Sequence, residues 1–526
     1  MEHSNASHRL VKGAFLLTLS GLAGKILSAG YRIPLQNIAG DVGFYIYQQV
    51  YPILGMALIL SLYGFPVAIS RLVSDLHEEG MKLSIQAFYI PIFSWVLAIC
   101  GIIFLTGFTQ AEQIAQIMGD EQLVPSLRGA FCVFLFIPFT SVLRGVFQGK
   151  GIMEPTAVSQ VTEQTVRVIV IIATALYASR TGELYDIGVG GAWSSILGTL
   201  AAAIVLWVLW LRQEKPPFAE SHKSKVSYVR PILFYGLFIS LNYMLLLFFQ
   251  FVDSLSLVSY LERAGFRVEE ARVAKGVFDR GQPLIQLGTV LASSLALALV
   301  PSVTRKRLQK DPLQVQKYIF GAVKYSLLVA AGAAAGLIVL FPAVNSLLFQ
   351  DTAGTDSLRI LMVVIIFSSL AITLSSVLQG LGFTGHTAFV ILLAVFMKAG
   401  LNISLIPLFK ESGAAIGSIG AAAFVTGAYL LLLNRDFPLK HWSRLPWKGM
   451  AGALSGMVLF LIVLSPLLAF VEHRLALLVS LLIMIGSGAA VYLILLIWLG
   501  ALEQKELESL PFRDWLVKLL PKGREL

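Results

Sequence analysis

The chain has 526 residues, of which 57% are hydrophobic and 13% are charged, and its mean hydropathy is +0.79. Soluble globular domains carry about 25% charged residues, so this composition excludes an ordinary soluble protein and indicates an integral membrane protein. The formal net charge of +10 could reflect binding to nucleic acid or to anionic lipid. We interpret it instead as basic cytoplasmic loops that fix the topology, and we expect no nucleic-acid partner.

Apolar segments of about 20 residues recur along the chain, and each is long enough to cross a bilayer as a helix. We therefore predict an all-α membrane protein with about fourteen spans. In chain order they lie near residues 12–38, 43–70, 86–108, 123–145, 157–178, 186–212, 231–256, 277–303, 317–342, 357–380, 386–408, 413–434, 450–471 and 474–500. The first segment lacks the short apolar core and small-residue cleavage site of a signal peptide, so we expect it to stay as a span.

Basic residues cluster in the even-numbered connections between these spans, as in Arg305, Lys306 and Arg307. The odd-numbered connections are acidic or nearly uncharged, as at Asp351. The positive-inside rule therefore predicts that both termini lie in the cytoplasm. The segment 262–275 departs from this pattern, and its mixed charge predicts an amphipathic surface helix.

The sequence lacks the motifs of several other function classes. It contains no GxxxxGK[ST] phosphate loop, no HExxH motif and no cysteine–histidine spacing typical of a metal site. The connections are too short for a nucleotide-binding domain. Cys100 and Cys132 both lie in apolar segments, where cysteine usually acts as a small hydrophobic residue. We therefore expect no ATP-driven transport within this chain, no metal and no redox chemistry.

Two distant segments of the chain are similar to each other. "VFQGKGIMEPTA" at 146–157 aligns with "VLQGLGFTGHTA" at 377–388. At the same offset, Arg167 aligns with Lys398. This similarity indicates that the second half of the chain repeats the first.

The repeat predicts two parallel lobes of six spans each. They comprise residues 1–212 and 231–435, joined by a cytoplasmic linker at 213–230 and followed by two further spans and a cytoplasmic tail at 436–526. In transporters built from such repeats, the substrate site lies between the halves near the middle of the membrane, and rocking of the halves gives alternating access.

Charged and polar side chains within the apolar segments mark a candidate substrate site. A charge in the hydrocarbon region is costly, so it normally faces a polar cavity or a partner. Basic residues outnumber acidic ones at these positions. The candidate substrate-binding residues are Lys25, Arg32, Glu163, Arg167, Gln250, Asp253, Asp279, Arg280 and Lys398.

Several of these candidates have an alternative structural interpretation. Glu163 and Arg167 stand four residues apart and could form an intrahelical ion pair. Arg32 could extend toward a membrane face, and Asp279 with Arg280 could end a loop. If most of the basic groups line one cavity, its cargo is anionic, and a mixture of arginine and lysine favours a pyrophosphate group. Arg280 would then bind the cargo, and Asp279 would orient it or balance its charge.

Three stretches resemble those of a known transporter family. They are "GKILSAGYRIPLQNIAGDVGFYIYQQVYP" in the first two spans, "LYGFPVAISRLVSD" after them, and "RGVFQGKGIMEPTAVSQVTEQTVRV" across spans four and five. They are similar to the polysaccharide transporters related to stage V sporulation protein B, which share a superfamily with MATE exporters and the lipid II flippase MurJ.

This resemblance implies a fourteen-helix flippase of undecaprenyl-pyrophosphate-linked sugars in a bacterial cytoplasmic membrane. Such a flippase would serve peptidoglycan, spore cortex or another surface polysaccharide. Its partners would be an anionic lipid-linked glycan, membrane lipids and proteins of cell-wall synthesis.

The resemblance also implies roles for individual residues. In MurJ-like members, basic residues of the first and eighth spans contact the pyrophosphate, and "FDRGQP" resembles the eighth-span segment, which assigns that role to Arg280. Lys25 stands where relatives often have arginine, and Tyr31-Arg32 replaces an Arg-Asp pair. This departure leaves open a lipid-linked intermediate other than lipid II. The same members use their final two helices as a lipid-tail groove; here spans thirteen and fourteen are apolar and lie outside the repeat.

We predict a secondary flippase and not an enzyme. Lys25, Arg32 and Arg280 would hold the phosphate, and Asp253 and Asp279 could couple the return step to H⁺, Na⁺ or the membrane potential. Three alternatives stay open. A MATE-like cation-coupled multidrug exporter would require an acidic cavity, a membrane-embedded polysaccharide-synthesis enzyme would usually carry larger outer loops, and a non-transporting scaffold would need neither.

Overall fold

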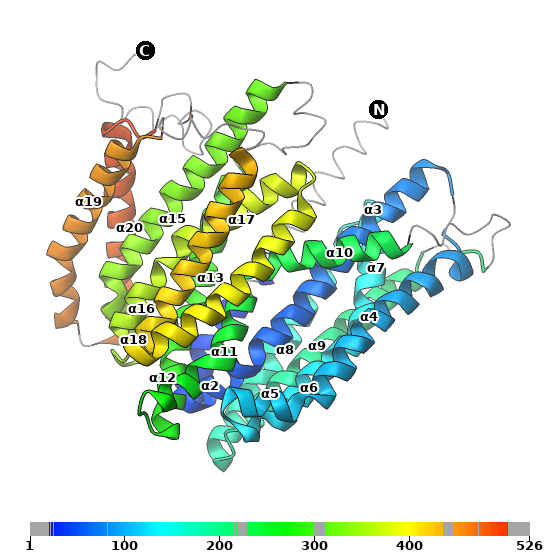
Figure 1. The fold of residues 1–526 in the computed structure, drawn as a ribbon, viewed down its shortest axis with the longest axis horizontal. Coiled ribbons are helices and arrows are strands. Elements are labelled where there is room, and N and C mark those ends of the chain that lie inside the picture. The colour runs from blue at the N-terminus through cyan, green and yellow to red at the C-terminus, as the bar shows by residue number, and fades with distance from the viewer. Residues whose placement is uncertain are drawn as a thin grey trace. The chain divides into compact units, whose positions relative to one another are not determined.

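The computed structural model is built from helices, as Figure 1 shows. It describes residues 20–21, 23–24, 26–81, 83–213, 216–218, 229–298, 311–434, 445–471, 473–502 and 506. Within these ranges the chain forms no strand. The predicted all-α class is therefore confirmed.

The helices of the first part of the chain are α2 (Arg32–Ile59), α3 (Phe65–Glu78), α4 (Ile90–Thr109), α5 (Ala111–Met118), α6 (Val124–Cys132), α7 (Ile137–Gly149), α8 (Glu154–Thr181), α9 (Asp186–Leu211), α10 (Val229–Tyr243), α11 (Leu245–Arg263) and α12 (Val268–Asp279). Short 3₁₀ or π-helical segments join some of them: η1 (Leu60–Gly64), η2 (Ile85–Tyr89), η3 (Glu121–Leu123) and η4 (Val133–Phe136). The remaining elements are α13 (Gly281–Ala298), α15 (Pro312–Phe349), α16 (Thr355–Met362), α17 (Val364–Gly380), α18 (Thr384–Asn434), α19 (Trp447–Leu464), η7 (Ser465–Phe470) and α20 (Arg474–Trp498).

Eleven helical segments within the described residues are long and apolar enough to cross a membrane. Thr384–Asn434 contains two of the predicted spans, and Ile26–Glu78 contains the second predicted span, 43–70, and the later part of the first, 12–38. Gly40 (φ +67°) and Lys410 (φ +54°) interrupt the helical path inside them. The eighth predicted span, 277–303, is not among the eleven, and part of it lies outside the described residues.

The seventh span differs from its prediction at 231–256. Met244 has φ −95° and ψ 3°, a conformation outside the α-helical region, and it separates α10 from α11. The segment long enough to cross the membrane is therefore Leu245–Arg263. The mixed-charge segment after it enters α12, where Glu269 and Glu270 are exposed and Lys275 is buried.

The chain divides into two compact units. The first unit comprises Met1–Asp279 and Thr384–Lys410, and the second comprises Arg280–Phe383 and Glu411–Leu526. The predicted six-span lobes follow the sequence repeat rather than this division, so the lobes stay a prediction.

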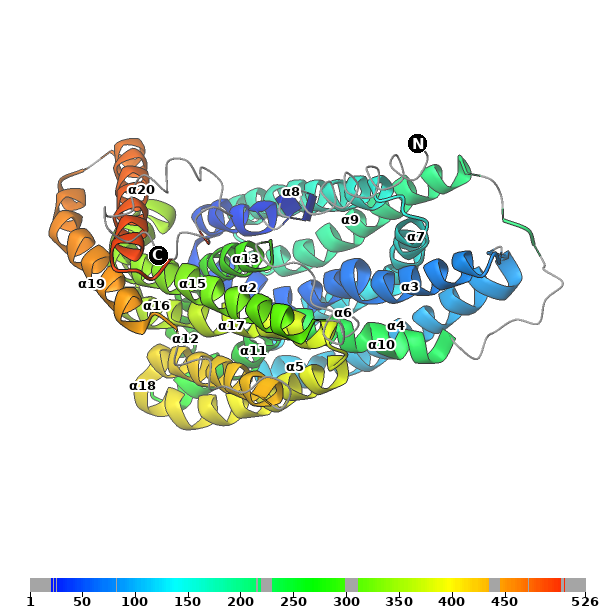
Figure 2. The ribbon, with the colours of Figure 1, turned by 90° about the horizontal axis from the view of Figure 1, so that it is seen from above.

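Glycines bring helices of the first unit close together. A Cβ added at Gly198 of α9 would lie 2.8 Å from the carbonyl oxygen of Glu163 in α8, and Figure 2 shows these two helices side by side. A Cβ at Gly276 of α12 would lie 2.2 Å from the carbonyl oxygen of Asp41 in α2. Any larger residue would push these helices apart, so glycine sets the positions of the charged side chains on α8 and α12.

The second unit is built around the long helix α15, which contacts α13, α17, α19 and α20. Figure 1 shows α15 beside α19 and α20. Tyr492 of α20 donates a hydrogen bond to the carbonyl of Leu328 at 2.9 Å, and its ring packs where Gly332 leaves room. Buried leucines and methionines of α15, α19 and α20 complete this core.

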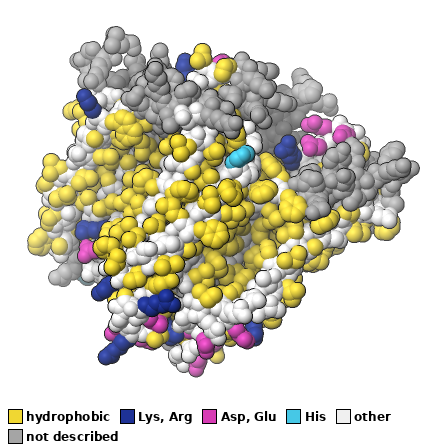
Figure 3. All heavy atoms as spheres, in the orientation of Figure 1, with side chains coloured by type: hydrophobic (Ala, Val, Ile, Leu, Met, Phe, Trp, Pro, Cys, Tyr) yellow, Lys and Arg dark blue, Asp and Glu magenta, His cyan; other side chains and the backbone are white. Residues whose placement is uncertain are grey.

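Large hydrophobic side chains are exposed along the helices, including Phe396 at 76% and Phe470 at 82%. In Figure 3, hydrophobic side chains cover most of the described surface in view, and charged side chains lie mainly toward its edges. Apolar surface of this extent is typical of helices that face lipid. The chain is a multi-pass membrane protein.

Candidate functional site

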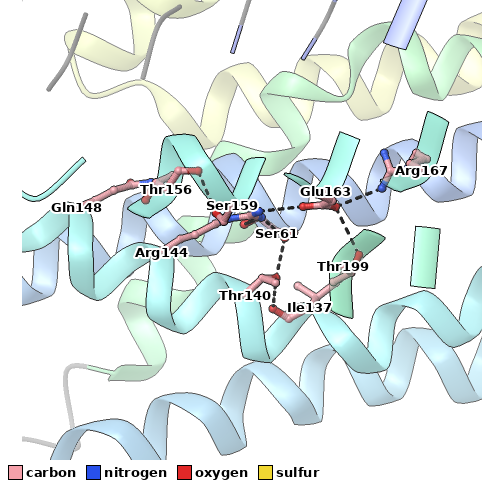
Figure 4. Close-up of polar contacts among 10 residues, drawn as sticks. All are labelled: Ser61, Ile137, Thr140, Arg144, Gln148, Thr156, Ser159, Glu163, Arg167 and Thr199. Carbon is pink, nitrogen blue, oxygen red and sulfur yellow. Dashed lines mark hydrogen bonds and ion pairs between the residues drawn. The ribbon is translucent and has the colours of Figure 1, made fainter. Parts of the chain in front are cut away.

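Glu163 lies between two arginines in the first unit, as Figure 4 shows. Its carboxylate accepts hydrogen bonds from Arg144 Nη2 at 2.8 Å and from Arg167 Nη2 at 3.2 Å. All three side chains are buried. We call these residues the Glu163 cluster. The intrahelical pair of Glu163 and Arg167 is therefore present, and Arg144 of α7 is a second partner.

The guanidinium of Arg144 has protein acceptors for each of its nitrogens. Its Nε donates to Ser159 Oγ at 3.1 Å, and its Nη1 donates to Ser61 Oγ at 2.7 Å and to the Ser61 carbonyl at 3.3 Å. Ser61 lies in the π-helical turn η1, a geometry often found where helices carry special contacts. These bonds join η1, α7 and α8, so Arg144 has a structural role. Sequence reasoning did not single it out, although it is a charge within the fourth apolar segment.

Asp253 of α11 and Lys398 of α18 form a second buried ion pair in the first unit. Lys398 Nζ lies 2.7 Å from Asp253 Oδ1 and donates to Asn402 Oδ1 at 2.9 Å. Asn402 Nδ2 in turn donates to Asp253 Oδ1 at 2.9 Å and to Ser256 Oγ at 2.8 Å. Two helices far apart in sequence are thus joined by polar contacts, although Asp253 Oδ2 has no hydrogen-bond partner within the described residues.

Lys275 and Asp279 form a third buried pair, within α12. Lys275 Nζ lies 2.6 Å from Asp279 Oδ1 and 2.5 Å from Oδ2. The two pairs lie within electrostatic range of each other, Asp279 of Asp253 and Lys275 of Lys398. Asp279 also interacts with Arg32. We call Arg32, Asp253, Lys275, Asp279 and Lys398 the Arg32 cluster.

Arg32 is the member of this cluster without a carboxylate partner. Its side chain is fully buried, and its guanidinium lies 3.8 Å from the centre of the Tyr51 ring. The guanidinium interacts electrostatically with the hydroxyls of Tyr31, Tyr47 and Tyr51, but none of its three nitrogens makes a well-aligned hydrogen bond to the part of the chain that the structure describes. The cluster holds three cations against two carboxylates, so it carries an excess of positive charge.

The chain reversal at Gly40 creates this environment. Tyr31 hydrogen-bonds to Tyr47, and their rings lie 6.0 Å apart, although sixteen residues separate them. Such contacts require the two halves of α2 to fold back on each other. Gly40 permits the reversal because its positive φ is costly for residues with a Cβ. Arg32 is thereby enclosed by aromatic rings and stabilised by a cation–π contact.

Gln250 of α11 stands one helical turn before Asp253. It is 4% exposed, and neither of its side-chain amide atoms has a hydrogen-bond partner within the described residues. A buried amide in this state costs free energy unless something completes its bonds. Gln250 therefore places an amide donor and an amide acceptor, both without a partner in the described residues, on the same helix as Asp253 of the Arg32 cluster.

Arg280 lies in the second unit, where it is fully buried. Its Nη1 and Nη2 lie 2.5 and 2.9 Å from the two carboxylate oxygens of Asp351, and Nη1 lies 3.5 Å from Asn345 Oδ1. These hydrogen bonds lower the pKa of Asp351. Asp279 accepts from Lys275 instead, so Asp279 and Arg280 have separate partners.

Lys25 lies outside the described residues, so its predicted role is untested. Among the residues that the structure does describe, no group of three or more His, Cys, Asp or Glu side chains could hold a metal ion.

Several known proteins are similar to this chain over most of its length. It is 37% identical to the protein named uncharacterized membrane protein YabM of Bacillus subtilis (strain 168), over 98% of both chains. It is 25% identical to the lipid II flippase MurJ of the same organism, covering 81% of this chain and 83% of that protein. It is 24% identical to stage V sporulation protein B, over 97% and 99% of the two chains.

Solved structures share the fold. The lipid II flippase MurJ in its inward closed conformation matches with a TM-score of 0.65 at 14% identity, over 91% of this chain and 98% of that one. An inward-facing multidrug resistance MATE family transporter of the MOP superfamily matches with a TM-score of 0.64 at 18% identity, over 79% and 95%. The model of the polysaccharide biosynthesis protein family matches residues 10–307. The chain therefore belongs to the polysaccharide biosynthesis protein family and has the fold of the MurJ and MATE transporters.

Proposed function

We propose that the chain is a flippase that moves an undecaprenyl-pyrophosphate-linked oligosaccharide across the cytoplasmic membrane by alternating access. The observation that carries this proposal is Arg32, a fully buried guanidinium that makes no direct ion pair and no well-aligned hydrogen bond within the described part of the chain. A buried cation is costly unless an anion compensates it, and the cation–π contact with Tyr51 compensates only in part. A phosphate group of the cargo would supply the missing charge.

The other members of the Arg32 cluster leave the positive excess on Arg32. Lys275 and Lys398 already have carboxylate partners, so these two pairs are neutral overall and would not bind the phosphate directly. Arginine suits phosphate because its planar guanidinium donates two parallel hydrogen bonds. Arg32 is therefore the residue to which we assign the phosphate contact. Lys25 keeps the same predicted role.

The structure gives less support to a phosphate contact by Arg280, because its guanidinium is already paired with Asp351. For Arg280 to bind phosphate, the Arg280–Asp351 pair would have to open as the protein changes conformation. Glu163 is paired with both Arg144 and Arg167, although Arg167 Nε has no acceptor within the described residues, and we assign Glu163 and Arg167 to holding helices rather than to cargo.

The alternative of a MATE-like multidrug exporter rests on the shared fold, which is compatible with many functions. An exporter of cationic drugs would need an excess of carboxylates in its buried clusters. The Arg32 cluster has the opposite balance, and this favours an anionic cargo. We propose further that both termini are cytoplasmic, that H⁺, Na⁺ or the membrane potential drives the return step, and that cell-wall synthesis proteins are partners.

Reconstitution into liposomes tests the proposal. Purified protein would be incorporated with a labelled undecaprenyl-pyrophosphate oligosaccharide, and transfer between leaflets would be measured by protection of the label. We expect transfer by the unmodified protein and by Arg180→Gln, an exposed control at the end of α8, and loss of transfer in Arg32→Gln. Absence of transfer by a folded, unmodified protein would reject this cargo.

A further inference from the structure

A pocket of about 380 Å³ lies in the second unit, where α15 turns into α16 and η7 turns into α20. We call it the hairpin pocket. Both turns join consecutive membrane-crossing segments, so the pocket lies near the level of the lipid head groups rather than at the bilayer centre. Its volume is within the range of about 300–1,000 Å³ typical of small-ligand sites. Its polar lining residues are Ser346, Thr352, Arg359 and Ser465.

Pro342 explains why Arg359 stands at this pocket. A proline inside a helix has no N–H, so the carbonyl four residues earlier loses its helical donor. In α15 that carbonyl belongs to Ile338, and Arg359 Nε donates to it at 2.9 Å. This is the one hydrogen bond that Arg359 makes to the described residues. Both Nη groups of Arg359 therefore keep their donor capacity.

The charges around the pocket favour an anion. Asp351, which follows α15, is engaged by Arg280, and Asp356 makes no ion pair with Arg359 within the described residues. A second arginine, Arg474 at the start of α20, donates to the carbonyls of Leu347 and Leu348 at the end of α15. Two guanidinium groups thus lie at the two turns, and Arg359 makes no ion pair with a carboxylate of the described residues.

The apolar part of the lining and its rim fit an acyl chain. Leu340, Leu468 and Leu477 line the pocket. Beside it, Phe470 is 82% exposed and Leu475 is 74% exposed, which places apolar surface where lipid chains would run. A pocket with one guanidinium at head-group level and an apolar wall matches an amphiphile with a phosphate head.

We propose that the hairpin pocket binds an anionic phospholipid, with its phosphate on the Nη groups of Arg359 and its chains along the leucines. The bound lipid joins the α15–α16 turn to the η7–α20 turn and stabilises the second unit. The ligand is a bulk membrane lipid and not the transported glycan, so this inference does not depend on the proposed function.

Lipid titration of the full-length protein tests the proposal. Purified protein, stripped of lipid in detergent, would be titrated with phosphatidylglycerol and with phosphatidylcholine, and binding would be followed by native mass spectrometry and by thermal unfolding. We expect phosphatidylglycerol to bind and to raise the unfolding temperature. Arg359→Gln should weaken this binding about 10- to 100-fold, the range for loss of a charged hydrogen bond.

Two further variants isolate the site. Ala343→Leu adds volume to the pocket lining without changing charge, and it should weaken binding of phosphatidylglycerol while Arg359 stays intact. Arg128→Gln removes an exposed arginine of the first unit and should leave binding unchanged. Arg359→Gln also removes the hydrogen bond to the Ile338 carbonyl and could destabilise α15. If Arg359→Gln does not fold, the binding of phosphatidylglycerol to Ala343→Leu tests the proposal.

Three results would overturn the proposal. The first is equal binding of the two phospholipids, and the second is unchanged phosphatidylglycerol binding in Ala343→Leu. The third is stabilisation by inorganic phosphate alone to the same extent as by lipid, since this would identify a simple anion site.

Discussion

The two buried charge clusters of the first unit differ in how their arginines are satisfied. In the Glu163 cluster, each nitrogen of Arg144 has a protein acceptor, and Arg167 donates to Glu163 although its Nε has no acceptor among the described residues. In the Arg32 cluster, aromatic side chains surround the Arg32 guanidinium, and none of its nitrogens makes a well-aligned hydrogen bond to the described residues. Both clusters hold more cations than carboxylates, so net charge does not separate them. The hydrogen bonds of Arg144 and Arg32 do separate the clusters. They favour a structural role for the Glu163 cluster and ligand binding for the Arg32 cluster.

Removal of the carboxylate from the Glu163 cluster should have the largest effect. Glu163→Ala leaves Arg144 and Arg167 buried without a counter-charge, and breaking buried ion pairs in this way costs about 3–5 kcal/mol. We expect a loss in unfolding free energy near the upper end of that range, measured by denaturation in detergent. Arg180→Gln, a solvent-exposed change, should have little effect. A loss under about 1 kcal/mol for Glu163→Ala would show that the cluster does not hold the helices together.

The Asp253–Lys398 pair allows a sharper test of charge balance. Asp253→Asn leaves the Lys398 ammonium buried without a carboxylate and should cost about 3 kcal/mol of unfolding free energy. Asp253→Asn combined with Lys398→Met removes both charges and should restore much of the loss, because buried pairs can often be replaced by neutral residues. Denaturation of these two variants and of Lys398→Met alone measures the coupling. Equal destabilisation by both would indicate that the pair is not the dominant interaction of these side chains.

The Arg280–Asp351 pair should give the smallest and most pH-dependent effect. Its hydrogen bonds hold the folded-state pKa of Asp351 below the usual value. The contribution to stability is therefore present above the unfolded pKa of about 3.9 and is lost as the pH falls toward the folded value. The difference in unfolding temperature between the unmodified protein and Asp351→Asn should be constant from pH 8 to about 5 and should shrink below about pH 4. A difference in unfolding temperature that grows on acidification would contradict a stabilising role for the ionised Asp351 carboxylate.

Much of the fold was open to prediction, because the length and hydropathy of the apolar segments specify an all-helical membrane protein. The exceptions are places where backbone conformation overrides hydropathy, as at Met244, which breaks the apolar segment predicted as the seventh span. Gly40 agrees with the prediction, because its positive φ breaks the helix between the predicted spans 12–38 and 43–70.

The candidate site was predictable only where partners are close in sequence. The spacing of four residues identified the Glu163–Arg167 pair, and the same spacing joins Lys275 to Asp279 and Lys398 to Asn402. Asp279 and Arg280 are adjacent, and adjacent residues do not point the same way on a helix, so the sequence association of these two was misleading. Partners such as Asp351, 71 residues after Arg280, follow from tertiary packing that one sequence does not reveal.

Equilibrium binding at Arg32 tests the central claim most directly. Undecaprenyl pyrophosphate would be titrated into the purified protein in detergent and its affinity measured by calorimetry, with Arg32→Gln and Arg180→Gln in parallel. We predict that Arg32→Gln binds about 10- to 100-fold more weakly while keeping its unfolding temperature, and that Arg180→Gln binds like the unmodified protein. Unchanged affinity in a folded Arg32→Gln variant would contradict the assignment of phosphate to Arg32.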